Sequence, residues 1–255
     1  MTRIRRPIAL ALFFVFCSLG CAGLLFHRPV PTGVEGSQAE ALADRIEASV
    51  NADAWRQTGA VEWTFPRGHS HLWDRQRHWH RLQWDGCTAW IDLNTRQGRA
   101  ECNGEVVEGE ALEERLESAW SIWANDSFWL NPLTKLRDDG TERRLVTLDE
   151  GGSGLLITYR SGGVTPGDSY LWIVDESNQV IACKMWVQVL PIGGVQFSWE
   201  DWQTLETGAR VATRHRGPLG FTIELTHIRA ESSLAALYPD GDPFAPLVEH
   251  LDASP

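Results

Sequence analysis

Four histidines stand as two H-x-H pairs on either side of a possible hairpin turn. His69 and His71 form one pair, and His78 and His80 form the other. If the turn falls on residues 74 and 75, His71 faces His78 and His69 faces His80, so that all four side chains share one face of a sheet. Imidazole nitrogens placed in this way could bind zinc or copper.

The charges of the same stretch argue against a bound cation. Arg75, Arg77 and Arg81 lie in this hairpin, and their positive charge opposes that of a metal ion. We therefore predict a solvated polar hairpin without a metal and keep the four histidines as an alternative ligand set.

Other enzyme signatures are absent from the sequence. It contains no phosphate-binding G-x-x-x-x-G-K-[ST], no H-E-x-x-H, no C-x-x-C and no G-x-G-x-x-G. We predict no cofactor and no catalysis. The net charge of -11 also argues against nucleic acid as a partner, because phosphate backbones are bound by basic surfaces.

Two of the five cysteines are placed to form a disulfide bond. Cys87 and Cys102 end the stretch "CTAWIDLNTRQGRAEC". With a hairpin turn at Asn94 and Thr95, residue 87 falls opposite residue 102, and a bridge of this loop size stabilises a fold by about 3 kcal/mol. Cys183 lies on an apolar strand face, and we predict a buried, unreactive thiol there.

The N-terminus predicts attachment to a membrane. "MTRIRRP" carries three arginines, and residues 8–26 carry no charge. We favour an uncleaved transmembrane signal-anchor, with the rest of the chain facing the periplasm of the cell envelope. A lipoprotein signal acylated at Cys21 is the alternative, and a freely secreted form comes third.

The elements that follow predict a mainly β (α+β) protein. Residues 1–27 form the leader, 28–37 a Pro/Gly tether, 38–238 the folded domain and 239–255 a C-terminal tail. Apolar residues at helical spacing predict helices at about 37–54 and 109–124. About eleven short strands with turn signals between them, and without βαβ spacing, predict a strongly curved or closed antiparallel sheet.

The second predicted helix ends in "SIWANDSFWLNP", which is unusually rich in aromatic residues. The chain has 13 tryptophans in all. Such a content is typical either of an aromatic core or of a wide apolar interior that needs bulky lining. The aromatic stretch is therefore either a permanent plug of the core or a cover over an apolar site.

Several segments resemble the LolA/LolB-type lipoprotein-carrier superfamily. They are "TGAVEWTF" after the first helix, the amphipathic insert, and "YLWIVDESNQVIACKMWVQ" followed by "FSWEDWQTLETGARVAT". The resemblance covers most of residues 38–230 and concerns architecture. It implies an incomplete antiparallel barrel whose concave face is covered by two helices and holds acyl chains, with the second helix as a lid.

These observations predict a membrane-attached periplasmic half-barrel that binds a lipid or an acylated protein in an apolar cavity. The alternative is a structural or sensory envelope protein with a packed barrel that binds a protein partner. The residues predicted to line the cavity and its lid are Trp120, Trp123, Phe128, Trp129, Trp172, Met185, Val187, Phe197 and Trp199.

Overall fold

The computed structural model describes residues 27–161, 166–190 and 192–253. The charge-free segment of the predicted leader and Cys21 lie outside these residues, so the choice between anchor and lipoprotein remains a prediction. Within the described residues, no helix has the length and apolar character needed to cross a membrane.

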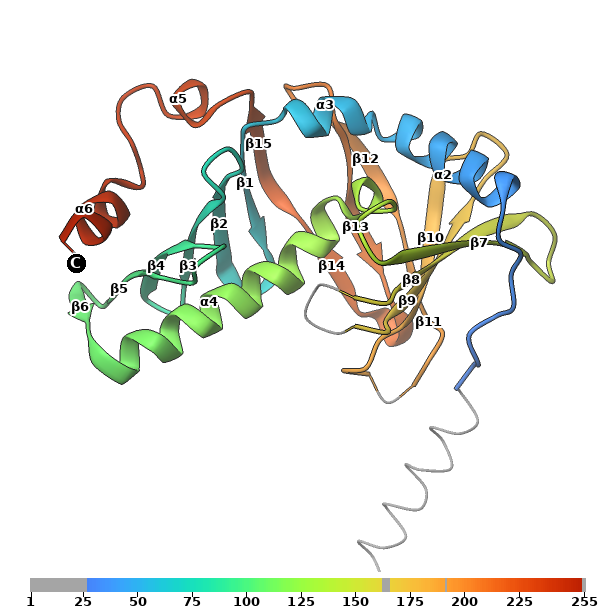
Figure 1. Ribbon diagram of the computed structural model, residues 1–255, viewed down its shortest axis with the longest axis horizontal. Coiled ribbons are helices and arrows are strands. Elements are labelled where there is room, and N and C mark those ends of the chain that lie inside the picture. Colours follow the sequence, from blue (N-terminus) through green and yellow to red (C-terminus); the bar gives the residue numbers. More distant parts are fainter. Residues whose placement is uncertain (1–26, 162–165, 191, 254–255) are drawn as a thin grey trace, which may run out of the picture.

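Fifteen strands of the described residues form three antiparallel sheets (Figure 1). The seven-stranded sheet has the order β15-β1-β2-β3-β4-β5-β6. Its strands are β1 (Ala60–Phe65), β2 (His69–Asp74), β3 (Trp79–Trp84), β4 (Cys87–Asp92), β5 (Gly98–Cys102), β6 (Glu105–Val107) and β15 (Thr226–Glu231).

The other two sheets have five and three strands, with the orders β11-β10-β9-β8-β7 and β12-β13-β14. The five-stranded sheet contains β7 (Thr141–Thr147), β8 (Ser153–Tyr159), β9 (Ser169–Val174), β10 (Val180–Trp186) and β11 (Val195–Ser198). The three-stranded sheet contains β12 (Glu200–Thr204), β13 (Arg210–Arg216) and β14 (Thr222–Glu224).

The three sheets follow one another as a single bent surface. Only Trp199 separates β11 from β12, and only Leu225 separates β14 from β15, so two chain segments pass from one sheet into the next. The outer strands β6 and β7 do not pair with each other. The predicted mainly β class, with a curved antiparallel sheet that is not closed, is confirmed.

The first predicted helix is two helices. α2 (Ser37–Ser49) and α3 (Ala52–Gln57) are separated at Asn51, whose φ of 50° is left-handed. Asparagine tolerates this conformation better than most residues, and its side chain accepts a hydrogen bond from the backbone N–H of Ala54. α2 packs on β7 and β8, with its buried face formed by Leu42 and Ile46 among others.

The second predicted helix extends further than the apolar periodicity indicates. α4 (Gly109–Leu130) continues through the aromatic stretch and stops before Pro132, which cannot continue a helix. It contacts β3, β4 and β5 at one end of the bent sheet and β13 toward the other. Figure 1 shows it crossing from the region of β6 to the region of β13.

The residues predicted to be a tail, 239–255, contain a helix, α6 (Ala245–Ala253), which follows the short helix α5 (Leu234–Leu237) at the end of the predicted domain. Phe244 and Leu247 are fully buried and pack in one cluster with Leu72 and Trp90 of the seven-stranded sheet. The segment is therefore folded against the outer face of that sheet, because its apolar side chains cover apolar strand residues.

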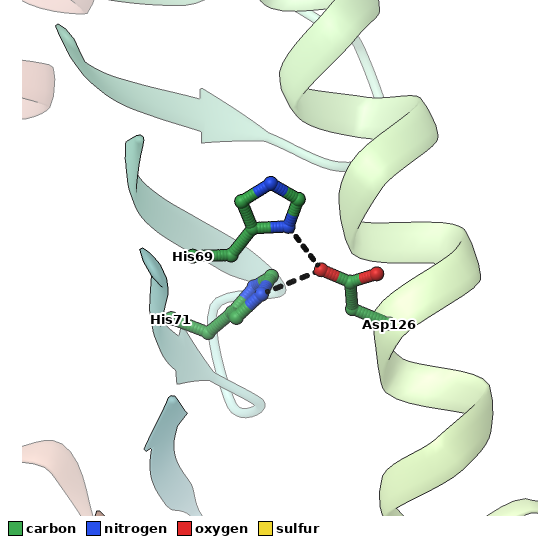
Figure 2. A group of neighbouring side chains, drawn as sticks. All are labelled: His69, His71 and Asp126. Atoms are coloured by element: carbon green, nitrogen blue, oxygen red, sulfur yellow. Dashed lines mark hydrogen bonds and ion pairs between the residues drawn. The ribbon is translucent and has the colours of Figure 1, made fainter. Parts of the chain in front are cut away.

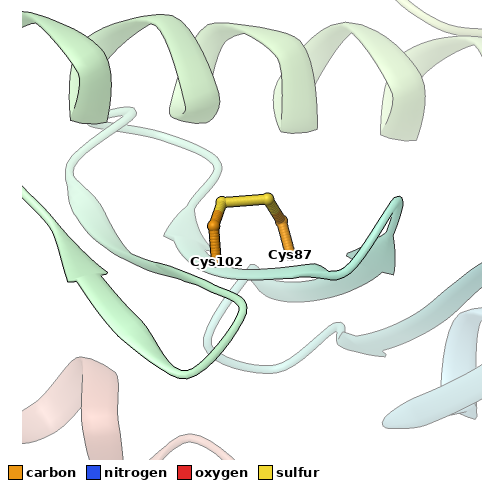
Figure 3. The surroundings of a disulfide bond; sticks show 2 residues. All are labelled: Cys87 and Cys102. Carbon is orange, nitrogen blue, oxygen red and sulfur yellow. A yellow bond between two sulfur atoms is a disulfide. The ribbon is translucent and has the colours of Figure 1, made fainter.

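The predicted disulfide joins Cys87 to Cys102 (Figure 3). The two residues face each other across β4 and β5 in the predicted register. Cys183 is free and buried, as predicted, and burial raises the pKa of its thiol well above the ordinary value. The sequence therefore predicted this hairpin correctly at the level of residue pairs.

Candidate functional site

The aromatic end of α4 packs into a cluster of rings from the other sheets. Trp129 lies 4.8 Å from Phe197 and 5.7 Å from Trp199, measured between ring centroids. Phe128 lies 6.1 Å from Trp172, which in turn lies 5.1 Å from Trp199. These rings occupy one another's surroundings, so the space between α4 and this part of the sheet is filled.

The remaining predicted cavity residues fall into two groups: two that lie with this aromatic cluster, and two that lie on the part of α4 beside the seven-stranded sheet. Met185 and Val187 are buried in the same core. Trp120 and Trp123 are half-buried; the Arg96 guanidinium lies 3.8 Å from the ring of Trp120. The nine residues therefore belong to one core, and the half-buried ones among them, Trp120, Trp123 and Phe128, all lie on α4.

An open hollow of about 740 Å³ lies beside α2, away from the predicted lid. Leu42, Leu145 and Val174 give it an apolar floor, and Arg45 and Asp175 lie at its polar rim. None of the nine predicted cavity residues lines it.

The histidine hairpin has a longer turn than predicted. His71 pairs with Leu82 and His80 with Trp73, so the predicted facing of His71 with His78 and of His69 with His80 is wrong. The carboxylate of Asp74 accepts hydrogen bonds from the backbone N–H groups of Gln76 and Arg77, which stabilises the wider turn.

The prediction of a solvated polar hairpin is also wrong for two of the four histidines. His71 and His80 are buried, at 2% and 0% exposure. His78 lies in the turn, where its Nδ1 is 2.8 Å from Oδ1 of Asn94. The concave face of β2 and β3 therefore carries a histidine cluster that lacks His78.

Asp126 of α4 completes this cluster (Figure 2). Its Oδ2 lies 2.7 Å from Nδ1 of His69 and 3.0 Å from Nε2 of His71. The Nδ2 group of Asn125 donates to its Oδ1 at 2.8 Å. Nδ1 of His71 is 3.1 Å from Nε2 of His80. A chain of polar groups thus runs from β3 through β2 to α4 inside an apolar core.

The electrostatics of the cluster follow from its burial. Burial lowers the pKa of His71, against the opposing effect of Asp126, and lowers that of His80 well below the ordinary value. Both imidazoles are therefore neutral at pH 7. Buried polar atoms without a hydrogen-bond partner within the described part of the chain include Nδ1 of His80 and Nε1 of Trp63, whose ring stacks on His71 at 4.3 Å.

The arginines that argued against a cation lie elsewhere. Arg75 stacks over Trp55 and Trp73 and donates to backbone carbonyls before β1. Arg77 binds Asp74 and Asp242. Arg81 lies near Tyr238, on the outer side of the sheet. Of the three guanidinium groups, that of Arg77 is paired with carboxylates, and that of Arg81 adds to the effect of burial in lowering the pKa of His80.

Sequence reasoning missed Asp126. The available signal was a lone acidic residue between Trp123 and Phe128 on a helix whose aromatic side chains face the core. Such a carboxylate requires a buried polar partner, and the histidine pairs were candidates for it. Nothing in the linear spacing specifies that partner, because His71 and Asp126 lie 55 residues apart.

Comparison with known proteins gives no family assignment. No family profile matches the sequence, and no curated protein matches it. A crystal structure of a DUF1329 family protein from Desulfovibrio piger has 14% identity and a TM-score of 0.43, covering 80% of this chain and 97% of that one. A putative outer membrane lipoprotein-sorting protein domain from Vibrio parahaemolyticus has 9% identity and a TM-score of 0.32, covering 74% and 93%.

Proposed function

We propose that this protein is a membrane-attached, periplasm-facing binding protein without catalytic activity, which takes up a lipid or the acyl chain of a lipid-modified protein beneath α4. The observation that carries the proposal is the position of α4. This helix lies across the inner side of a curved sheet that is not closed. Its aromatic side chains point into the core between the helix and the sheet. The two structural neighbours are too distant to support the proposal.

Uptake requires α4 to move, because aromatic rings fill the interior beneath its C-terminal end. Trp120 and Trp123 are half-buried, whereas Trp129 is 6% exposed. The middle of the helix is thus held by less apolar burial than its end, and local opening draws on weakly held segments. In this proposal the middle turns separate from β3–β5 while the C-terminal turn stays packed.

Attachment to a membrane agrees with the surroundings of residue 27. The backbone N–H of Arg28 donates to the carbonyl of Gly193, and the N–H of Gly193 donates to Nδ1 of His27. Val189 and Leu190 of the same loop are exposed apolar residues. The charge-free segment of residues 8–26 would therefore join the domain beside an apolar loop suited to a bilayer surface.

A photoreactive fatty acid incorporated into membranes that contain the whole chain tests the proposal. Crosslinked peptides should come from α4 and from β3, β4 or β5, the strands from which its middle turns separate. The variant with Trp120→Ala and Trp123→Ala should lose most of this labelling while its melting temperature falls only slightly. The substitution Val189→Ala is the matched control, because it alters an exposed apolar residue that could touch the bilayer and leaves α4 unchanged. Labelling confined to the 187–194 loop in the wild type would reject the acyl site.

The mode of attachment needs a separate experiment. Metabolic labelling with an acyl chain should leave the wild type and Cys21→Ala equally unlabelled if the leader is a transmembrane anchor. Label that depends on Cys21 would establish a lipoprotein instead and would leave the acyl-binding proposal unaffected.

The filled interior favours a second candidate function. Trp129, Trp172, Phe197 and Trp199 pack against one another with little exposure, as expected of a permanent core. In that case the protein is a structural or sensory envelope protein, and its loops bind a protein partner. Absence of any fatty-acid crosslink together with a large loss of stability in the Trp120 and Trp123 double variant would favour this candidate.

A further inference from the structure

Three metal-ligand atoms converge between β2 and α4. They are Nδ1 of His69, Nε2 of His71 and Oδ2 of Asp126, and all lie within 4.8 Å of one another. Figure 2 shows both imidazoles directed at the carboxylate. We propose that these three residues bind a divalent transition-metal ion, with Zn²⁺ as the best fit, and that the ion fastens α4 to the seven-stranded sheet.

The local structure explains why these side chains meet. Residues two apart on a strand point to the same face, so the H-x-H pair presents both imidazoles to the interior. Asp126 is carried there by the last turns of α4. Ligand atoms of a tetrahedral zinc ion lie about 3.3 Å apart, given bond lengths of about 2.0–2.2 Å. Oδ2 of Asp126 lies closer than this to both nitrogens, at 2.7 and 3.0 Å, so an ion fits between them once the carboxylate withdraws from both imidazoles.

Neighbouring groups hold the three ligands in place. His80 lies against Nδ1 of His71 at 3.1 Å. If His71 donates its Nδ1 proton there, its Nε2 lone pair points at the metal position. Asn125 holds the second oxygen of Asp126, and Trp63 stacks flat on the His71 ring. Such outer partners fix the tautomer and orientation of metal ligands.

The charge of the site favours a cation. The side chains of His71 and Asp126 are 0% and 2% exposed, and the polar partners of this carboxylate are imidazoles and one amide. A buried carboxylate without a counter-charge is costly, and a divalent ion would supply that charge. His69 is 14% exposed at its side chain, which gives the ion a route from solvent.

Binding of the ion does not depend on lipid uptake, so the two proposals are tested separately. The untagged whole chain in detergent micelles is stripped with a chelator and then titrated with Zn²⁺ by calorimetry. One Zn²⁺ should bind per chain and raise the melting temperature. Co²⁺ should bind at the same stoichiometry and show the visible absorption of a tetrahedral complex with nitrogen and oxygen ligands.

Variants locate the ion. His71→Gln and Asp126→Asn keep side-chain size and should each weaken Zn²⁺ binding by more than 100-fold, while His80→Phe, which removes only an outer partner, should weaken it by about 10–100-fold. His78→Gln is the matched control in the same hairpin and should bind like the wild type. Circular dichroism confirms that each variant is folded.

Two results would overturn the proposal. One is a folded wild-type chain that binds no stoichiometric Zn²⁺, in which case the cluster is a hydrogen-bonded chain alone. The other is Zn²⁺ binding that survives both His71→Gln and Asp126→Asn, because the ion would then occupy an adventitious surface site.

Discussion

Two parts of the same helix meet the two ends of the bent sheet through different chemistry. Toward β2 and β3, α4 presents Asp126 to a cluster of histidines. Toward β9–β13 it presents Phe128 and Trp129 to other aromatic rings. The strength of the aromatic contact does not depend on protonation or on bound metal. The strength of the Asp126 contact depends on both, because the groups that face this carboxylate are histidines.

The difference indicates which contact can be released. Separating the aromatic rings would expose a large apolar area to water, at a cost proportional to that area. Separating Asp126 from its partners exchanges protein hydrogen bonds for water hydrogen bonds, at a smaller net cost. We therefore expect α4 to open from the histidine side while its aromatic end remains docked.

The largest expected effect is at the aromatic end. Trp129→Ala should lower the free energy of unfolding by about 3–5 kcal/mol, because it removes a buried ring and leaves a cavity among Phe197, Trp199 and His215. Chemical denaturation measures it. Trp120→Ala, on the more exposed middle of α4, is the comparison and should cost much less. Equal losses would remove the distinction between the two parts of the helix.

The disulfide comes next and lies at the other end of the sheet. Replacing Cys87 and Cys102 together by alanine should destabilise the fold by about 3 kcal/mol, because the unfolded chain regains the freedom of the closed loop. Denaturation under non-reducing conditions measures the difference. Adding reductant to the wild type should reproduce it, and Cys183→Ala, which keeps the disulfide, should lose the same stability on reduction. A negligible loss would mean that packing alone fixes this hairpin.

The aromatic end of α4 also contacts one titratable group, His215, whose ring packs on Trp129 and Trp199. It is fully buried, and its Nε2 lies 3.2 Å from the carbonyl of Trp129. Burial lowers its pKa to about 4. Between this value and about 6.5, the unfolded chain binds a proton that the folded chain does not, so stability falls as the pH falls.

The expected slope is at most about 1.4 kcal/mol per pH unit in that window. His215→Gln keeps a donor for the Trp129 carbonyl but cannot titrate. The difference in unfolding free energy between wild type and variant, measured from pH 7 to pH 4.5, should therefore shrink or reverse as the pH falls. A difference that stays constant with pH would show that His215 binds its proton equally in the folded and the unfolded chain.

Local sequence determined much of the architecture. The Cys87 to Cys102 register follows from a hairpin whose turn and spacing are readable within sixteen residues. The mainly β class follows from short alternating segments and their turn residues. The presence of the amphipathic helix follows from its periodicity, although its end did not, because tertiary packing of the aromatic side chains continues the helix to Leu130.

Tertiary structure alone decided the polar cluster. The sequence suggested that His69 and His71 share a face, but Asp74 closes a wider turn. His78 lies in that turn instead of opposite His71, and its ring packs on Trp73 and Trp123. The meeting of His71 with Asp126 depends on how α4 lies across the sheet, since the two residues are separated by 55 positions. Short-range spacing fixes faces and pairs within a hairpin, whereas contacts between a helix and a distant strand depend on the packing of the whole core.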